Sequence, residues 1–265
     1  MELRELGSTG IRVSPIGLGT VKFGRNRQVK YPSPFELPGD DEIEQLLSIA
    51  QELGINLIDT APAYGSSQER LGKLLPGPRD SWVIVSKVGE QFDERGSTFD
   101  FSHRAVISTV EESLRTLGTD YLDTVLIHSD GNDLRILEHE GAFDALCELK
   151  ERGLIRSHGM SSKSCEGGLW VVQHMDVVMA TCNLQYSDDL PVLEAAARLN
   201  KGVLIKKGLL SGHLAENSSL ADSFTHIYSQ PGVSSVIIGT INPDHLRRNA
   251  ALAEIHSQTL SQEKT

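Results

Sequence analysis

Cysteine is scarce in this sequence, and the cysteines and histidines form no common metal-binding motif. The three cysteines are odd in number and never spaced as Cys-x-x-Cys, which predicts neither a disulfide framework nor a zinc knuckle. Nine histidines are present without a His-Glu-x-x-His pair, the usual helical zinc signature. We therefore expect no metal and three free thiols, at Cys147, Cys165 and Cys182.

Long apolar runs and an excess of positive charge are also missing. No apolar stretch approaches the ~20 residues that span a bilayer. The 25 Lys and Arg against 36 Asp and Glu give a formal charge of -11, which would repel nucleic-acid phosphates. The start, Met1 to Glu5, lacks the basic and apolar regions of a secretion signal. We expect a cytoplasmic protein that binds neither membranes nor nucleic acids, as a monomer or a weak homo-oligomer.

The order of the elements predicts an α/β fold. Short aliphatic runs alternate with longer stretches of helical period, as in βα units with a parallel sheet. The eight strand candidates are 16–18, 56–59, 82–87, 124–128, 157–160, 177–181, 203–206 and 235–239. Eight strands in 265 residues fit a (β/α)8 TIM barrel, whose typical length is ~250 residues. We expect one domain over residues 1–265.

Several segments outside the repeat have patterns of their own. Residues 3–6 and 11–13 flank a turn and predict an N-terminal β-hairpin that plugs the bottom of the barrel. Ser102 is placed to cap a helix, and Asn242 with Pro243 forms an N-cap and first-turn pair. Residues 24–40 have no periodicity, which predicts a functional or mobile loop.

Two common dinucleotide-binding patterns are absent. Gly17-Leu18-Gly19-Thr20 begins like Gly-x-Gly-x-x-Gly, but Lys22 replaces the third glycine and a loop replaces the phosphate-binding helix. None of the five tyrosines is followed by a lysine four residues later, which excludes the short-chain dehydrogenase pattern.

Four polar residues fall where a barrel carries its chemistry. Asp59, Lys87 and His128 end neighbouring strands, ~4.8 Å apart, at the C-terminal face. Tyr64 follows Asp59 by five residues, so its hydroxyl can join them. A Lys87 ammonium held by Asp59 would favour ionisation of the Tyr64 phenol and make it a usable proton donor. The alternative is a structural ion pair, a packing tyrosine and a histidine that caps a strand; four such residues together favour catalysis.

The chain resembles the aldo-keto reductase family over nearly its whole length. The hairpin and the segments 17–20, 59–65, 86–87, 126–128 and 239–249 look like that family's motifs in their usual order. The resemblance implies an oxidoreductase that uses a nicotinamide cofactor to interconvert carbonyls and alcohols. It also implies that Tyr64 is the general acid and base, that Lys87 and Asp59 tune it, and that His128 orients the substrate carbonyl.

The resemblance also implies a set of cofactor-binding residues. They are Gly19, Thr20, Val21, Asp59, Ser161, Ser162, Asn183, Lys206, Leu209, Ser211, Gly212, Gly239, Thr240, Ile241, Asn242, His245 and Asn249. Ser162 and Asn183 depart from the family's usual Asn and Gln, and Lys206 stands where a tyrosine stacks on the nicotinamide. Ile241 stands where a Lys or Arg often binds the 2′-phosphate. We therefore expect NADP, with modest discrimination against NAD.

The end of the chain predicts an open substrate pocket. The last helix is predicted from 242 to about 255, and the polar tail 257–265 should fray rather than cover the site. Val21, Phe23, Phe92 and the loop 24–40 are then left to border a pocket for small carbonyls or sugars. Two alternatives are an NADP-binding regulatory or redox-sensing subunit without turnover and an unrelated barrel enzyme such as a phosphate-sugar isomerase.

Overall fold

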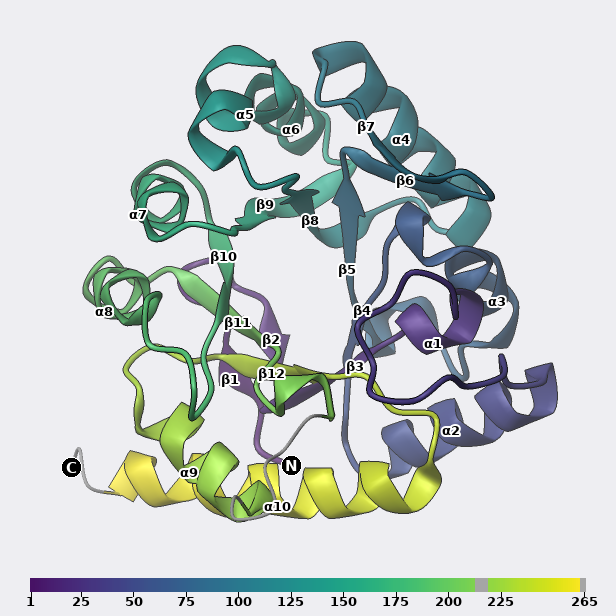
Figure 1. Ribbon diagram of the computed structural model, residues 1–265, viewed down its shortest axis with the longest axis vertical. Coiled ribbons are helices and arrows are strands. Elements are labelled where there is room, and N and C mark those ends of the chain that lie inside the picture. Colours follow the sequence, from purple (N-terminus) through teal and green to yellow (C-terminus); the bar gives the residue numbers. More distant parts are fainter. Residues whose placement is uncertain (213–218, 263–265) are drawn as a thin grey trace.

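Eight parallel strands form a closed barrel in the computed structural model, which describes residues 1–212 and 219–262 (Figure 1). Around the barrel the strand order is β10-β11-β12-β3-β4-β5-β8-β9. The strands are β3 (Ile16–Gly19), β4 (Leu57–Asp59), β5 (Val83–Val88), β8 (Leu122–His128), β9 (Ile155–Ser161), β10 (Val177–Thr181), β11 (Gly202–Lys206) and β12 (Ser235–Ile238). Each of the eight predicted strands is present with its ends within two residues, and the (β/α)8 prediction is confirmed.

Helices surround the barrel and follow its strands in sequence (Figure 1). They are α1 (Val21–Gly24), α2 (Asp40–Glu52), α3 (Ser67–Leu74), α4 (His103–Leu117), α5 (Asp133–His139), α6 (Ala142–Glu151), α7 (Cys165–His174), α8 (Leu190–Arg198), α9 (Leu220–Ser229) and α10 (Pro243–Gln262). Ser102 Oγ caps α4 by accepting a hydrogen bond from Ala105 N at 3.3 Å. Asn242 Oδ1 accepts from Asp244 N and His245 N at 2.9 and 3.0 Å. Both predicted caps are confirmed.

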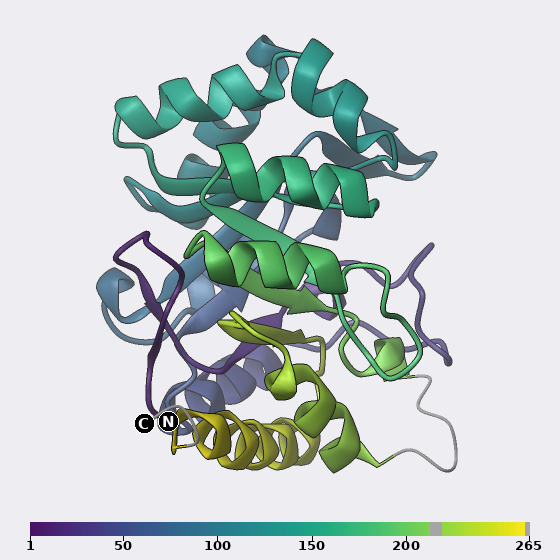
Figure 2. The ribbon, with the colours of Figure 1, turned by 90° about the vertical axis from the view of Figure 1, so that its left-hand side faces the viewer.

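The N-terminal hairpin closes the bottom of the barrel. Its strands β1 (Arg4–Glu5) and β2 (Arg12–Val13) pair antiparallel. Leu6 and Val13 are fully buried and pack with side chains from inside the barrel, including Leu57 and Met179. Figure 2 shows the hairpin at one end of the molecule and the loop after α1 at the opposite end. The predicted plug is confirmed, and it leaves the C-terminal face for the active site.

The structure corrects two local expectations and adds one element. Helix α10 runs to Gln262 with Ser257 buried, so the tail does not fray from 257; residues 263–265 lie outside the described residues. Phe23 is fully buried and does not border a pocket. A second hairpin, β6 (Glu90–Asp93) and β7 (Gly96–Phe99), follows β5 and was not predicted. Residues 25–39 form no helix or strand, as expected.

In the described part of the chain, no helix combines enough length with enough apolar character to cross a bilayer.

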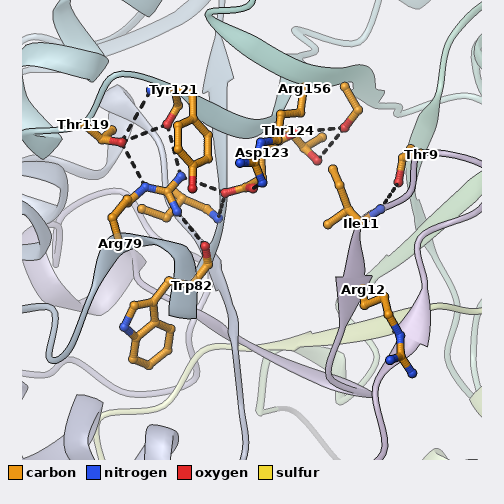
Figure 3. A network of polar contacts seen from close by, with 12 residues as sticks. Thr9, Ile11, Arg12, Arg79, Trp82, Thr119, Tyr121, Asp123, Thr124 and Arg156 are labelled. Carbon is orange, nitrogen blue, oxygen red and sulfur yellow. Dashed lines mark hydrogen bonds and ion pairs between the residues drawn. The ribbon is translucent and has the colours of Figure 1, made fainter.

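A buried carboxylate ties strands together near the start of β8 (Figure 3). Asp123 Oδ2 accepts hydrogen bonds from Arg79 Nη2 at 2.7 Å and from Ile84 N at 2.9 Å. Asp123 Oδ1 accepts from Arg156 Nη1 at 3.1 Å. The two guanidinium carbons lie 4.3 and 3.9 Å from the centre of the Tyr121 ring, so the arginines also make cation–π contacts. Asp123 therefore joins β8 to β5 and β9 through charge-assisted bonds.

Asp123→Asn should lower the free energy of unfolding by about 2–3 kcal/mol, because charge-assisted bonds and the balance of a buried charge are lost. Urea unfolding followed by circular dichroism measures the loss. Asp244→Asn is the matched control, since Asp244 is 91% exposed and pairs with Arg247 on the surface; its effect should be much smaller. Equal effects of the two substitutions would contradict the assigned role of Asp123.

Candidate active site

A cavity of about 600 Å³ opens at the C-terminal ends of the barrel strands. The four predicted catalytic residues all line it. Asp59 ends β4, Lys87 is the second-last residue of β5 and His128 ends β8. Tyr64 ends the short 3-10 helix η1 (Pro62–Tyr64), where Pro62 starts the turn that folds the loop back over the barrel. The fold therefore brings the four residues together.

A buried ion pair lies at the base of the cavity. Lys87 Nζ donates to Asp59 Oδ1 at 2.5 Å and to the carbonyl oxygen of Thr60 at 3.0 Å. Both side chains are at most 5% exposed. Burial lowers the pKa of Lys87, and Asp59 opposes this shift by stabilising the ammonium. Lys87 Nζ also lies 4.7 Å from the centre of the Tyr64 ring.

The pKa of Tyr64 shifts in the direction opposite to the sequence prediction. Burial raises the pKa of its phenol well above the usual value of 10.0, and the negative charges of Asp59 and Glu90 raise it further. The prediction overlooked two physical facts: Asp59 already neutralises Lys87, and the phenol is buried. Tyr64 is therefore a neutral hydroxyl at neutral pH and can donate a proton or a hydrogen bond.

Tyr64 should stay un-ionised up to about pH 10, the reference pKa of a tyrosine in solution. The ultraviolet titration curves of the wild type and Tyr64→Phe should then coincide up to that pH. A phenolate signal below it that is present in the wild type and lost in Tyr64→Phe would show that Lys87 does lower the pKa.

Glu90 is a neighbour of His128 that sequence reasoning missed. It starts β6, and its Oε2 lies 2.8 Å from His128 Nδ1. Phe92 of the same strand packs against Tyr64 and its neighbouring alanines. Arg25 lies over the Phe92 ring, 3.6 Å from its centre. The available signal was Gly96 between two short polar segments that each contain a phenylalanine, Phe92 and Phe99, a pattern that lies outside the βα repeat.

The structure divides the expected cofactor residues into two groups. Those that line the cavity are Gly19, Val21, Asp59, Ser161, Lys206, Leu209, Ser211, Gly212, Gly239, Thr240, His245 and Asn249. Thr20, Ser162, Asn183, Ile241 and Asn242 are not in its lining. Each of these has another local contact: for example, Thr20 Oγ1 donates to Asp59 O at 2.9 Å, and Ile241 packs against the main core.

Lys206, at the end of β11, is a second, half-buried lysine in the cavity lining. Its Nζ donates to Ser161 Oγ at 2.9 Å and to the carbonyl oxygen of Ser162 at 2.5 Å. Burial, together with the charge of the nearby Lys207, lowers the pKa of Lys206 to about 7. Among the described residues, no carboxylate forms a salt bridge with Lys206.

The cavity is positively charged although the protein is acidic. Lys22, Lys207 and Arg248 line it in addition to Lys206 and Lys87, and Asp59 is its sole acidic lining residue among those described. Tyr31 and Pro32 of the irregular loop also line it. This charge suits a ligand that carries several phosphates.

A buried polar atom in the cavity lining also fits a dinucleotide. Asn249 Oδ1 is buried without a hydrogen-bond partner among the described residues, and it can accept from a base amino group. In the described ranges, no group of three or more His, Cys, Asp and Glu side chains is arranged to hold a metal ion.

Comparison with known proteins identifies the family. The family model "Aldo/keto reductase family" matches residues 15–222, and the chain belongs to this family. A putative aldo-keto reductase from Pseudomonas aeruginosa has a similar crystal structure, with 49% identity, a TM-score of 0.88, and coverage of 97% of this chain and 96% of that chain.

Two curated relatives extend the comparison. The L-galactose dehydrogenase of Arabidopsis thaliana is 28% identical over 99% of this chain and 92% of its own length. The D-arabinose 1-dehydrogenase of Saccharomyces cerevisiae is 30% identical over 73% of this chain and 59% of its own. The protein is therefore an oxidoreductase acting on carbonyls or alcohols, in a family that uses nicotinamide cofactors.

Proposed function

We propose that the protein is a cytoplasmic, NADP-dependent enzyme that interconverts small aldehydes or sugars and the corresponding alcohols, with Tyr64 as the general acid and base. The observation that carries the proposal is one cavity that holds Asp59, Tyr64, Lys87 and His128 together with further lysines and an arginine in its lining. When bound, the nicotinamide supplies or accepts the hydride. The three free cysteines agree with a reducing compartment.

Each catalytic side chain has a separate role at the substrate oxygen. The neutral Tyr64 hydroxyl donates to this oxygen and can protonate it as the carbonyl is reduced. The Lys87 ammonium stabilises negative charge that develops there, and Asp59 holds the ammonium in place. His128 orients the substrate. Its ring centre lies 6.2 Å from that of Tyr64. A barrel that only senses NADP needs none of these groups, so we favour catalysis over the regulatory alternative.

Tyr64→Phe should reduce kcat for carbonyl reduction by roughly 10²–10⁴, because the proton donor is lost while the ring is kept. NADPH binding should change little. Stopped-flow kinetics with propionaldehyde and fluorescence titration with NADPH measure the two effects.

Tyr121→Phe provides the matched control, since Tyr121 lies between two arginines far from the cavity lining. It should retain activity. Parental activity in Tyr64→Phe would overturn the role proposed for Tyr64.

The preference for NADP rests on Arg248. It lines the cavity beside His245 and Asn249, and no salt bridge engages it among the described residues. Ile241 packs against the main core and has no charge to offer a phosphate. A free guanidinium can bind a phosphate through two parallel hydrogen bonds. We propose that Arg248 binds the 2′-phosphate, which NAD lacks.

Arg248→Gln should weaken NADPH binding roughly tenfold to a hundredfold, the range of a charge-assisted hydrogen bond, and leave NADH binding nearly unchanged. Fluorescence titration with both cofactors gives the two dissociation constants. Arg247→Gln is the adjacent control, because Arg247 pairs with Asp244 and does not line the cavity. An equal loss of affinity for both cofactors in Arg248→Gln would mean that Arg248 does not recognise the 2′-phosphate.

A further inference from the structure

Lys206 borders the same end of the cavity as His128. The strands β8 and β9 are paired so that their last residues, His128 and Ser161, lie side by side. Lys206 ends β11, and its Nζ donates to Ser161 Oγ at 2.9 Å. Burial lowers the pKa of the His128 imidazole, and the positive charge of Lys206 is a further cause that lowers it. Lys206 therefore lies within electrostatic reach of the catalytic residues.

The Lys206 side chain is held by neutral acceptors, the hydroxyl of Ser161 and the carbonyl oxygen of Ser162. Two carboxylates are near enough to act on its charge, those of Asp133 and Asp189. Both bond to backbone instead: Asp133 Oδ2 accepts from two N–H groups just before α7, each at 2.8 Å. Asp189 Oδ2 accepts from the N–H of the last residue of β10 at 2.9 Å. Within the described residues, the charge of Lys206 is thus not cancelled in a direct ion pair.

Lys206 titrates near neutral pH. Burial is the largest cause of a shift that lowers its pKa to about 7. Lys207 and Lys163 contribute to this lowering through their positive charges. Asp189 and Asp133 oppose it. Lys206 is therefore an ammonium in mildly acidic solution and a neutral amine in alkaline solution.

The two redox forms of a nicotinamide cofactor differ in charge at the ring that exchanges the hydride. The oxidised ring carries a positive charge and the reduced ring is neutral, whereas the rest of the cofactor is the same in both. Hydride transfer requires the ring to contact the substrate carbon. Because Tyr64 and His128 hold the substrate oxygen in the proposed function, the ring belongs at their end of the cavity. Ser161 Oγ fits the ring carboxamide there, since it accepts from Lys206 and keeps its own proton to donate.

We propose that Lys206 determines which redox form of the cofactor binds better, because its ammonium disfavours the positively charged oxidised ring and leaves the neutral reduced ring little affected. The inference rests on the function proposed above. Like charges repel more strongly in a protein site than in water, since the effective dielectric constant is lower there. The protein with a charged Lys206 therefore holds the reduced cofactor more tightly and releases the oxidised cofactor more readily.

The first test compares affinities. Isothermal titration calorimetry at about pH 6 and about pH 9, on either side of the Lys206 pKa, gives Kd for NADP⁺ and NADPH. The variant Lys206→Gln keeps hydrogen-bond donors without the charge. At the lower pH, the ratio of Kd for NADP⁺ to Kd for NADPH should be roughly fivefold to fiftyfold higher in the wild type than in the variant. At the higher pH the two ratios should approach each other. Equal ratios at the lower pH would overturn the proposal.

The second test counts protons. The same titrations in buffers of different ionisation enthalpy give the number of protons released on binding near neutral pH. The wild type should release more protons with NADP⁺ than with NADPH, because a second positive charge lowers the pKa of Lys206. The 2′-phosphate is common to both forms, so its own titration cancels. The difference should disappear in Lys206→Gln, and its persistence there would assign the proton to another group and refute the role of Lys206.

Two variants serve as matched controls. Lys206→Arg stays charged at every pH used, so its ratio should remain high at the alkaline pH as well. Arg248→Gln removes a cation elsewhere in the cavity lining. It should weaken both redox forms alike and leave their ratio unchanged, because the 2′-phosphate is present in both. Thermal unfolding confirms that each variant folds.

The design separates this proposal from the proposed function. If neither redox form binds, the proposed cofactor and the role of Lys206 both fail. If both forms bind and Lys206→Gln keeps the wild-type ratio, the role of Lys206 alone fails. NAD⁺ and NADH differ by the same ring charge. If they bind more tightly than the NADP pair, the preference assigned to Arg248 fails, and the same ratio measured with NAD⁺ and NADH decides the role of Lys206.

Discussion

The 2.5 Å ion pair between Lys87 and Asp59 is the constraint on which the cavity depends. Two charges so deeply buried are tolerated only when they pair closely and satisfy their remaining hydrogen-bonding groups, as Lys87 does with the Thr60 carbonyl. The pair places the Lys87 ammonium in the cavity lining, and the Asp59 carboxylate nearly cancels its charge. Tyr64 can therefore lie beside a cation and still keep its proton, which suits a hydroxyl that donates to a substrate.

Much of the fold is encoded in local patterns that a reader of the sequence can recognise. The strands follow from short aliphatic runs, and the ends of helices at Ser102 and Asn242 follow from side chains that bond to free backbone N–H groups. Asp59, Lys87 and His128 were predictable because parallel strands present their C-terminal ends on one face. Tyr64 was predictable from its short distance along the chain to Asp59.

The remainder depends on contacts between distant segments, which periodicity does not encode. Glu90 approaches His128 only because an extra hairpin bends over the barrel, and Arg25 reaches Glu90 across 65 positions of sequence. The shift in the Tyr64 pKa depends on burial and on the sum of several charges. Helix α10 extends past its predicted end with Ser257 buried, and a serine gives no apolar signal in the sequence.

The hairpin β1–β2 determines the side of the barrel from which ligands reach the cavity. It fills the bottom of the barrel with Leu6 and Val13, and apolar side chains fill the interior above them. Among the described residues, the packed interior leaves the C-terminal face of the barrel as the side from which the cavity exchanges its ligands. Cofactor and substrate therefore share this side, and each can obstruct the exchange of the other.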